Sequence, residues 1–410
     1  MSGRQWAPFF HLYQPPDWNP AVIRKVAREC YRPLLRILAD RPFAHVTINL
    51  SGSLAEQLVR LQLVDIIDLL RTLAERGQIE FTTSAKYHAI LPLLPAGERR
   101  RQLELNLKTN RRILGPVYQP RGLFPPEMCY STAVAELAVD QGLEYILLDE
   151  ISATGTIGDA RFDTRYTHPQ STVGVVFRHR PISDLFFTDR LRSTDDFFRA
   201  IDSDARCATS IVTAMDGELL GHHHPGLDTL FAQILDARRI ETRTLSEFRA
   251  ALGREERMDP LPGSWSSQPT ELAAGIPYGL WNNPENELHT KQWELLNLVV
   301  RAVTSDQNDP GYDDARALLD RRLNSDPQWW ASAMPWWDVA IIRDGAERLL
   351  AVLAKLHDPT TAYVTRARTL TREIGVLAQQ WQDTGKAATL RERSLHNGQV
   401  DRYFGGQQIS

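Results

Sequence analysis

The stretch that decides the fold reads HVTINL at residues 45–50, SLAEQLVRLQLVDIIDLLRTLAER at 53–76 and GQIEFTT at 77–83. The first and last segments are short and apolar, which is typical of buried strands. The middle segment carries apolar residues at helical spacing and ends at Gly77, a residue that favours the end of a helix. The stretch therefore predicts a strand–helix–strand unit of a parallel sheet.

The same alternation continues through the first 250 residues or so. Strands are predicted at residues 5–10, 45–50, 78–83, 122–125, 144–148, 174–178 and 209–214, and further helices at 99–114 and 132–141. About seven strand–helix units predict a closed or nearly closed β/α barrel. An open doubly wound sheet is the alternative, but no glycine-rich dinucleotide fingerprint follows the first strand.

Beyond residue 285 the pattern becomes helical, with amphipathic helices predicted at 287–303, 313–323, 337–356 and 360–381. The fold class expected is therefore α/β, a distorted (β/α)7 barrel followed by a C-terminal α-helical bundle. The expected boundaries are a catalytic barrel at 1–252, a connecting segment lining the cleft at 253–285, a bundle at 286–386 and a polar tail at 387–410.

Composition excludes several classes of function. The 410 residues carry a formal net charge of -4, so a nucleic-acid partner is not expected. No apolar run reaches the ~20 residues of a membrane helix, so no membrane partner is expected either. The three cysteines are sparse and unclustered, which fits a reducing compartment, and we expect a cytoplasmic protein.

Polar side chains follow most of the predicted strands, where the active site of a β/α barrel lies. These residues are His11 and Gln14; Lys86, Tyr87 and His88; Glu127; Asp149 and Glu150; Arg178 and Asp184; and Asp216, Glu218 and His222–His224. Carboxylates and imidazoles dominate this set. A pair of carboxyl groups is what glycoside chemistry needs, one to stabilise the sugar cation and one to protonate the leaving oxygen. Composition alone does not choose the pair.

Tryptophans provide a second hint of sugar binding, because the C–H faces of sugars pack against aromatic rings. Trp329–Trp330 and Trp336–Trp337 form two doublets, and Trp265 and Trp281 precede them. The alternative is that these side chains belong to the core of the helical bundle.

Five segments together carry a resemblance to glycoside hydrolase family 57, a family of α-amylases, 4-α-glucanotransferases, branching enzymes, amylopullulanases and α-galactosidases. They are HLYQPP (11–16), GQIEF (77–81) with YHAILPL (87–93), FPPEM (124–128), FRHRPISD (177–184) and MDGELLGH (215–222), in the family's order. The resemblance implies a distorted barrel, a helical domain that completes the cleft, and a retaining mechanism that needs no metal or other cofactor.

The resemblance also implies roles for individual residues. Glu127 matches the family's nucleophile and Asp216 its general acid/base, and His11 matches a histidine that contacts the sugar in the innermost subsite. For a retaining enzyme the two carboxyl groups are expected about 5–5.5 Å apart. The full set of expected substrate-binding residues is His11, Gln14, Tyr87, His88, Arg178, Asp184, Glu218, His222, Trp265, Trp281, Trp330 and Trp336.

Departures from the family's pattern fall around the inner subsites: Tyr13 replaces a second histidine, Pro125 and Pro126 precede the nucleophile, and His222–His224 replace a tryptophan. The expected partner is an oligo- or polysaccharide, most simply an α-glucan oligosaccharide. An α-galactosidase, a metal-dependent polysaccharide deacetylase and an inactive sugar-binding protein remain alternatives. A metal site at His222–His224 would require a loop, because residues i and i+2 do not share a helix face.

Overall fold

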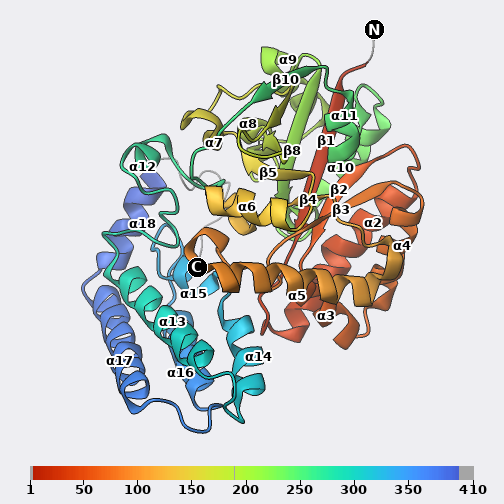
Figure 1. Ribbon diagram of the computed structural model, residues 1–410. Coiled ribbons are helices and arrows are strands. Elements are labelled where there is room, and N and C mark those ends of the chain that lie inside the picture. The colour runs from red at the N-terminus through yellow and green to blue at the C-terminus, as the bar shows by residue number, and fades with distance from the viewer. Residues whose placement is uncertain (1–2, 189, 397–410) are drawn as a thin grey trace. The chain divides into compact units, whose positions relative to one another are not determined.

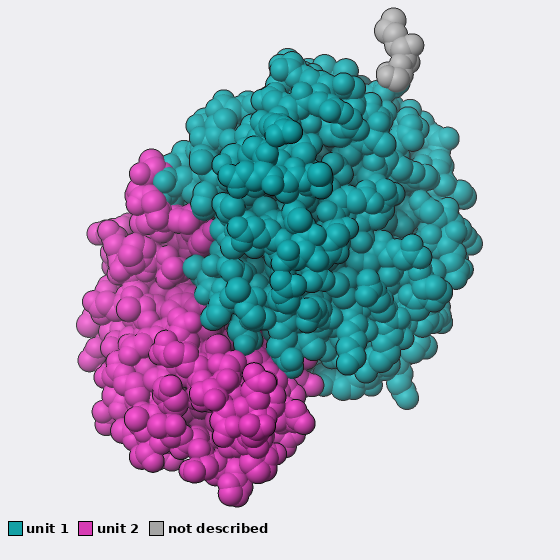
Figure 2. Space-filling view, in the orientation of Figure 1, with its two compact units in different colours: residues 1–86, 90–272, 402–410 teal, residues 87–89, 273–401 magenta. Residues whose placement is uncertain are grey.

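The computed structural model describes residues 3–188 and 190–396. These residues divide into two compact units, which Figure 2 colours separately. The barrel unit holds residues 3–86 and 90–272, and the helical unit holds residues 87–89 and 273–396. The connecting segment predicted at 253–285 is therefore divided between the two units.

The barrel unit is built on seven parallel strands (Figure 1). They are β1 (Gln5–Leu12), β2 (Val46–Leu50), β3 (Ile79–Thr83), β4 (Gly122–Leu123), β5 (Tyr145–Asp149), β7 (Gly174–Arg178) and β8 (Ser210–Asp216). Along the sheet they run β8-β1-β2-β3-β4-β5-β7. β7 and β8 stand at the two ends of this row. They are linked by a hydrogen bond from the N–H of His179, directly after β7, to the carbonyl of Val212 in β8 at 2.8 Å. The predicted (β/α)7 barrel is confirmed, each strand within two residues of its expected bounds.

The sequence analysis did not predict three further strands. β6 (Thr164–Thr167) pairs antiparallel with β7, β10 (Arg254–Arg257) pairs with β6, and β9 (Glu241–Thr242) pairs with β1. All four residues of β10 are exposed. Such a strand gives no hydrophobic pattern to detect, because it buries neither face.

Helices connect the strands of the barrel unit. Those between β1 and β5 are α1 (Pro20–Val26), the π-helical turn η1 (Ala27–Tyr31), α2 (Arg32–Ala39), α3 (Gly52–Arg60), α4 (Val64–Glu75), α5 (Ala96–Leu114) and α6 (Thr132–Asp140). Those after β5 are α7 (Ile151–Thr154), α8 (Arg180–Asp184), α9 (Thr194–Ser203), α10 (Leu227–Asp236), α11 (Leu245–Ala251) and α12 (Pro269–Ala273).

The single helix predicted over 53–76 is wrong. The chain breaks between α3 and α4, where Gln62 adopts a positive φ of 59°. A continuous helix of that length would span ~36 Å, about twice the length of the five-residue strands beside it. Breaking it lets Leu58 and Ile66 both reach the core that covers the sheet.

Alternate residues of each strand face the inside of the barrel. Ala7 and Phe9 of β1, Leu147 of β5, and Val212 and Ala214 of β8 belong to one interior cluster, together with Phe124 and Trp265. The same alternation carries the next inward positions to His11, Asp149 and Asp216, at the carboxyl ends of their strands. The barrel core therefore ends in a polar layer.

The helical unit is formed by α13 (Glu287–Ser305), α14 (Tyr312–Arg322), α15 (Asp326–Trp330), α16 (Val339–Leu353), α17 (Thr361–Asp383) and α18 (Lys386–His396). α13, α16 and α17 pack against one another. The four predicted helices correspond to α13, α14, α16 and α17. Of the predicted tail, residues 387–396 belong to α18 and residues 397–410 lie outside the described residues.

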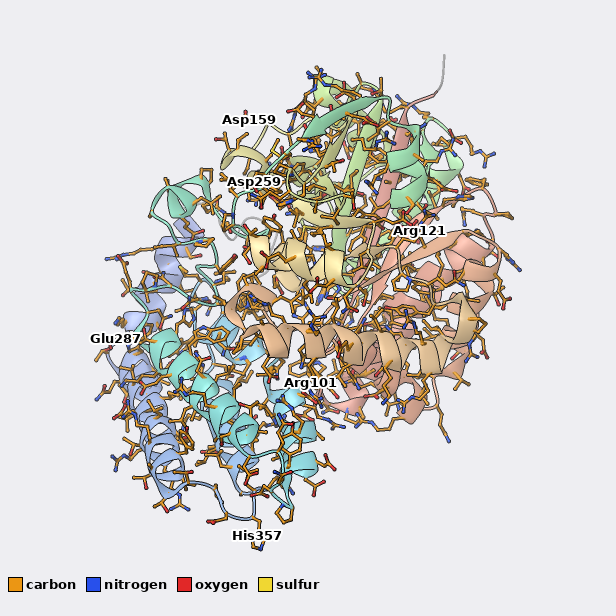
Figure 3. The ribbon with its side chains drawn as sticks, in the orientation of Figure 1. Arg101, Arg121, Asp159, Asp259, Glu287 and His357 are labelled. Carbon is orange, nitrogen blue, oxygen red and sulfur yellow. The ribbon has the colours of Figure 1, made fainter. Side chains whose placement is uncertain are left out.

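Charged side chains cover the surface of the barrel unit, as Arg121 and Asp159 illustrate (Figure 3). Acidic and basic residues are nearly balanced, at 51 and 47. Among the described residues, none of the helices combines the length and apolar character that crossing a membrane would take.

Candidate active site

Glu127 lies in a short turn directly after β4, in a strained backbone conformation. Its φ is 59°, and that of Met128 is 52°, a region that residues other than glycine rarely adopt. Pro125 and Pro126 fix the approach to the turn, because a proline restricts the residue before it to extended conformations. Consecutive strained residues of this kind are typical of functional sites.

Trp265 holds Glu127 at two points. The Trp265 N–H donates to the Glu127 carbonyl at 3.1 Å, and the indole Nε1 donates to Glu127 Oε2 at 2.6 Å. Trp265 was expected to be a platform for sugar rings. The structure adds a hydrogen bond that fixes the carboxylate of Glu127, and this bond is charge-assisted and short.

Asp216 ends β8 and lies opposite His11 of β1 in the strand register. The pKa of Asp216 is held well above the ordinary carboxyl range, first by burial and then by the negative charges of Glu218 and Glu127, while Arg178 opposes the shift. Because the charge of Glu127 contributes to this shift, the two expected catalytic carboxyls lie within electrostatic range of each other. A raised pKa favours the protonated form of the carboxyl, which is the form that a proton donor needs.

His11 sits in a row of polar residues that crosses adjacent strands. His11 Nδ1 lies 2.9 Å from Asn49 Oδ1, and Asn49 Nδ2 donates to Thr82 Oγ1 at 3.1 Å. Because the amide nitrogen of Asn49 is directed to Thr82, we infer that His11 carries its proton on Nδ1 and presents Nε2 as an acceptor. Burial lowers the pKa of His11 to about 4, although the hydrogen bond to Asn49 counteracts the shift. His11 is therefore neutral at physiological pH.

Arg178 and Arg180 enclose Asp149 in a buried ion network. Arg178 Nε donates to Asp149 Oδ2 at 2.6 Å and Arg180 Nε to Asp149 Oδ1 at 2.8 Å. Burial by itself would raise the pKa of Asp149, but the charges of Arg180 and Arg178 outweigh it and the pKa is lowered. Arg178 also contacts Asp184 at 3.3 Å and the Ala214 carbonyl at 3.1 Å, which places its charge beside Asp216.

Glu218, two residues beyond Asp216, is buried among hydrogen-bond donors. The Tyr31 hydroxyl and Gln14 Nε2, the latter at 3.2 Å, both donate to Glu218 Oε1. Burial raises the pKa of Glu218 to about 7, although these hydrogen bonds counteract the shift. Gln14 and Glu218, both expected to bind substrate, are thus brought together beside Asp216.

The first two residues of the histidine run, His222 and His223, have different surroundings. His222 Nδ1 pairs with Glu29 Oε2 at 2.8 Å, and the His223 side chain is exposed. Among the described residues, His222–His224 do not belong to a group of possible metal ligands.

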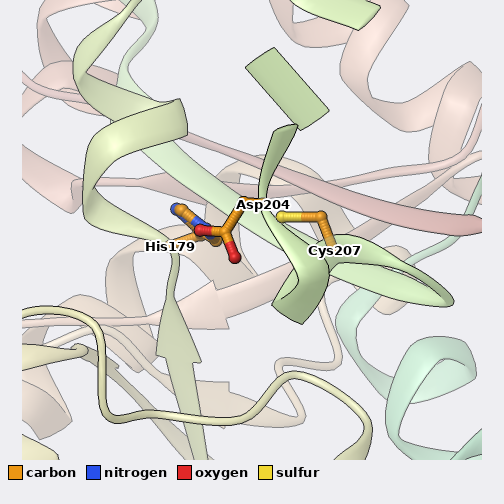
Figure 4. Close-up of side chains that lie close together, drawn as sticks. All are labelled: His179, Asp204 and Cys207. Carbon is orange, nitrogen blue, oxygen red and sulfur yellow. The ribbon is translucent and has the colours of Figure 1, made fainter. Parts of the chain in front are cut away.

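A His179–Asp204–Cys207 cluster has the spacing of a metal site, with candidate ligand atoms within 4.8 Å of one another (Figure 4). Arg206, however, donates to Asp204 at 2.7 Å and lies 3.1 Å from His179 Nε2. A guanidinium hydrogen-bonded to two of the three candidate ligands does not fit a cation, and we interpret the cluster as an ion-pair network.

Five of the expected sugar-binding residues belong to the helical unit: Tyr87, His88, Trp281, Trp330 and Trp336. His88 Nδ1 lies 3.0 Å from Ser325 Oγ. Trp330 and Trp336 form a half-buried cluster with Trp329, while Trp281 is 1% exposed. Their role in sugar binding stays a prediction.

Sequence reasoning missed two residues of the site, Tyr31 and Asn49. Tyr31 lies on a helix 187 residues away from its partner Glu218 in sequence, and Asn49 lies inside a strand. Neither follows a predicted strand, so the search for polar strand ends passed over both. A polar residue inside an apolar strand was the one available signal for Asn49.

Comparison with known proteins identifies the family of this chain. The family model of glycosyl hydrolase family 57 matches residues 7–259. The chain is 31% identical over 169 residues to an α-amylase of Pyrococcus horikoshii, covering 41% of this chain and 26% of that one. It is 26% identical over 253 residues to a 4-α-glucanotransferase of Thermococcus litoralis, covering 58% and 37%. The matches thus span about a quarter to a third of these curated relatives.

Among solved structures, a GH57-type branching enzyme from Pyrococcus horikoshii superimposes with a TM-score of 0.68 at 16% identity, covering 91% of this chain and 95% of that one. The Thermococcus litoralis 4-α-glucanotransferase gives a TM-score of 0.68 at 19% identity, covering 87% and 60%. At these identities the likeness shows the fold. Because the family model matches more than half of the sequence, the chain belongs to glycosyl hydrolase family 57.

Proposed function

We propose that this protein is a retaining enzyme that cleaves or transfers α-glycosidic bonds of α-glucan oligosaccharides, with Glu127 as nucleophile and Asp216 as general acid/base. The observation that carries the proposal is the contrast between the two carboxyls. Burial and the charges of Glu218 and Glu127 raise the pKa of Asp216 and favour its protonated form, while Glu127 accepts a hydrogen bond from Trp265. The family, and relatives named as α-amylase and 4-α-glucanotransferase, support the class of substrate.

In the first step, a Glu127 oxygen forms a bond to the anomeric carbon while the bond from that carbon to the leaving oxygen breaks. Asp216 gives its proton to that leaving oxygen, so that the departing sugar is released as a neutral hydroxyl. Trp265 Nε1 keeps Glu127 Oε2 in place during the attack. The product is a glycosyl ester on Glu127.

In the second step, water or a sugar hydroxyl attacks the anomeric carbon, Asp216 takes its proton, and Glu127 leaves as a carboxylate. The same residue must now act as a base, and the electrostatics of the site favour that change. Esterification removes the negative charge of Glu127, which is one of the causes of the raised pKa of Asp216. The pKa of Asp216 therefore falls in the intermediate, when a base is required.

Substrate contacts complete the proposal. Neutral His11 presents an acceptor for a sugar hydroxyl, and the Arg178–Asp184 pair lies beside Asp216. Gln14 and His222 are proposed to line the inner subsites. The aromatic residues of the helical unit are proposed as platforms for sugar rings.

Chromatographic analysis of products from maltoheptaose tests the proposal, with wild type, Glu127→Gln and a matched Glu75→Gln control. Glu75 is an exposed residue of α4, so its variant changes the same functional group away from the site. We expect shorter or longer oligomers from wild type and from the control, and none from Glu127→Gln. The size distribution separates hydrolysis from transfer, and added chelator is expected to leave the activity unchanged.

Other outcomes would redirect the assignment. Activity on α-galactosides without activity on maltoheptaose would replace the substrate class and keep the mechanism. Activity abolished by chelator would indicate metal-dependent chemistry. Sugar binding without turnover, unaffected by Glu127→Gln, would indicate an inactive sugar-binding protein.

A further inference from the structure

The π-helical turn η1 is fastened to the loop that follows Asp216 by three consecutive residues. Glu29 pairs with His222 at 2.8 Å, the Cys30 thiol donates to the Gly217 carbonyl at 2.9 Å, and the Tyr31 hydroxyl donates to Glu218. π-Helical turns are rare and are frequent at functional sites. Three consecutive residues of η1 thus contact the segment between Gly217 and His222.

The shell around Glu218 consists of neutral donors. Tyr31 and Gln14 donate to its carboxylate, and the backbone N–H groups of Glu218 and Tyr13 add further hydrogen bonds. These donors counteract burial, which raises the pKa of Glu218 to about 7, so its charged form is present from near-neutral pH upward without a cation to neutralise it. Its side chain is 5% exposed, so water screens that charge weakly.

The titratable groups near Glu218 are acidic or neutral. Tyr31 and Cys30 face it from η1, and both have a pKa raised well above the ordinary value by burial and by the charge of Glu218. Asp216 faces it from β8, and Asp228 of α10 acts on Cys30. Arg178 acts on Asp216, and His222 is bound to Glu29.

Resting on the proposed function, we infer that Tyr31, Gln14 and Glu218 form a positioning network that keeps a negative charge beside Asp216 and so holds Asp216 ready as the proton donor. Glu218 acts through Asp216 and transfers no proton to the substrate. The two carboxyls titrate as a coupled pair. Removing the charge of Glu218, or the donor that stabilises it, must then let Asp216 ionise at lower pH.

The pH dependence of kcat/KM for maltoheptaose tests the network, because its basic limb reports the essential acid of the free enzyme. In Glu218→Gln we expect this limb to move toward lower pH by about one unit. Tyr31→Phe should move it in the same direction by less, since the charge of Glu218 is weakened and not removed. With a nitrophenyl α-maltoside, whose leaving group needs little protonation, both variants should lose less activity than with maltoheptaose.

Glu29→Gln is the matched control, because it loosens the neighbouring contact of η1 without changing the groups around Glu218. We expect its basic limb to coincide with that of wild type. An unshifted limb in both Glu218→Gln and Tyr31→Phe, or an equal shift in Glu29→Gln, would overturn the inference.

A direct titration separates this inference from the proposed function. Carbon-13 NMR of the Asp216 carboxyl, assigned with Asp216→Asn, follows its ionisation in wild type and in Glu218→Gln whether or not either turns over a sugar. A lower Asp216 pKa in Glu218→Gln supports the network even if maltoheptaose proves not to be a substrate. An unchanged Asp216 pKa refutes it even if the glycosidase assignment holds.

Discussion

Asp149 and Glu218 are both buried carboxylates at the carboxyl ends of barrel strands, but their surroundings differ in charge. Asp149 is 0% exposed and lies between the guanidinium groups of Arg178 and Arg180, which lower its pKa. Glu218 is 5% exposed and lies among neutral donors beside Asp216, and its pKa is raised to about 7.

The difference shows how one barrel mouth keeps some acids ionised and others protonated. Desolvation favours the neutral acid in both cases, and only a nearby positive charge outweighs it. At Asp149, where the guanidinium groups are present, the carboxylate stays ionised and forms a structural ion pair. At Asp216, where the neighbours are the carboxylates Glu218 and Glu127, the pKa is raised and the protonated acid is favoured, as a proton donor requires.

The largest expected effect comes from replacing Asp216, the proposed proton donor. Asp216→Asn should lower kcat/KM for maltoheptaose by about 10²–10⁴-fold, because general acid catalysis contributes that much. Stability should be retained, since the variant removes no cation's partner. Steady-state kinetics with parallel urea unfolding measures both, and Asp140→Asn, at the exposed last residue of α6, is the control. Activity within tenfold of wild type would refute the role of Asp216.

The next largest effect is expected from removing the ion-paired carboxylate of Asp149. Asp149→Asn leaves Arg178 and Arg180 buried without their carboxylate, which we expect to cost about 3–5 kcal/mol of unfolding free energy. The control is Asp202→Asn, whose partner Arg4 lies at the surface and whose loss should cost under about 1 kcal/mol. Urea unfolding monitored by circular dichroism gives both values. Equal losses in the two variants would mean that the buried network contributes no more than a surface pair.

The third effect is a difference in pH dependence. The pKa of Glu218 is about 7 in the fold, against an ordinary value of 4.5, so the unfolded chain releases this proton first as pH rises. Its stabilising contribution is complete below pH 4.5 and lost by about pH 7. Asp149 has the opposite sign, because its pKa is lowered from 3.8 and its contribution is lost only as pH falls below that range.

Unfolding free energies at pH 5, 6, 7 and 8 distinguish the two. Relative to wild type, Glu218→Gln should gain stability as pH rises, by on the order of 3 kcal/mol over the whole range from 4.5 to 7. The difference between Asp149→Asn and wild type should stay constant over the same pH values. Parallel pH profiles for all three proteins would contradict the assignment of opposite shifts.

Most of the fold could be predicted from the sequence, because strand–helix alternation is a local pattern. The seven barrel strands and the four long helices of the helical unit all appear in it. The prediction failed where local pattern and tertiary geometry diverge: the continuous apolar periodicity of residues 53–76 hides the break at Gln62, and the exposed β10 carries no periodicity at all.

For the candidate site, the sequence by itself determined which chemical groups gather at one end of the barrel. Parallel strands carry the residues that follow them to the same edge, so His11, Glu127, Arg178 and Asp216 could be grouped from their positions alone. Family motifs then assigned roles to two of them. Both inferences depend on residue order, which the sequence contains in full.

Only the tertiary structure decided the state of those groups. A pKa depends on burial and on charges a few ångströms away, and such neighbours come from distant parts of the chain. Tyr31 reaches Glu218 across 187 residues, and Trp265 reaches Glu127 across 138. The sequence therefore identified the acids. The tertiary packing around them, including that of η1 and Trp265, determined which acid forms an ion pair, which is fixed by a hydrogen bond and which has a raised pKa.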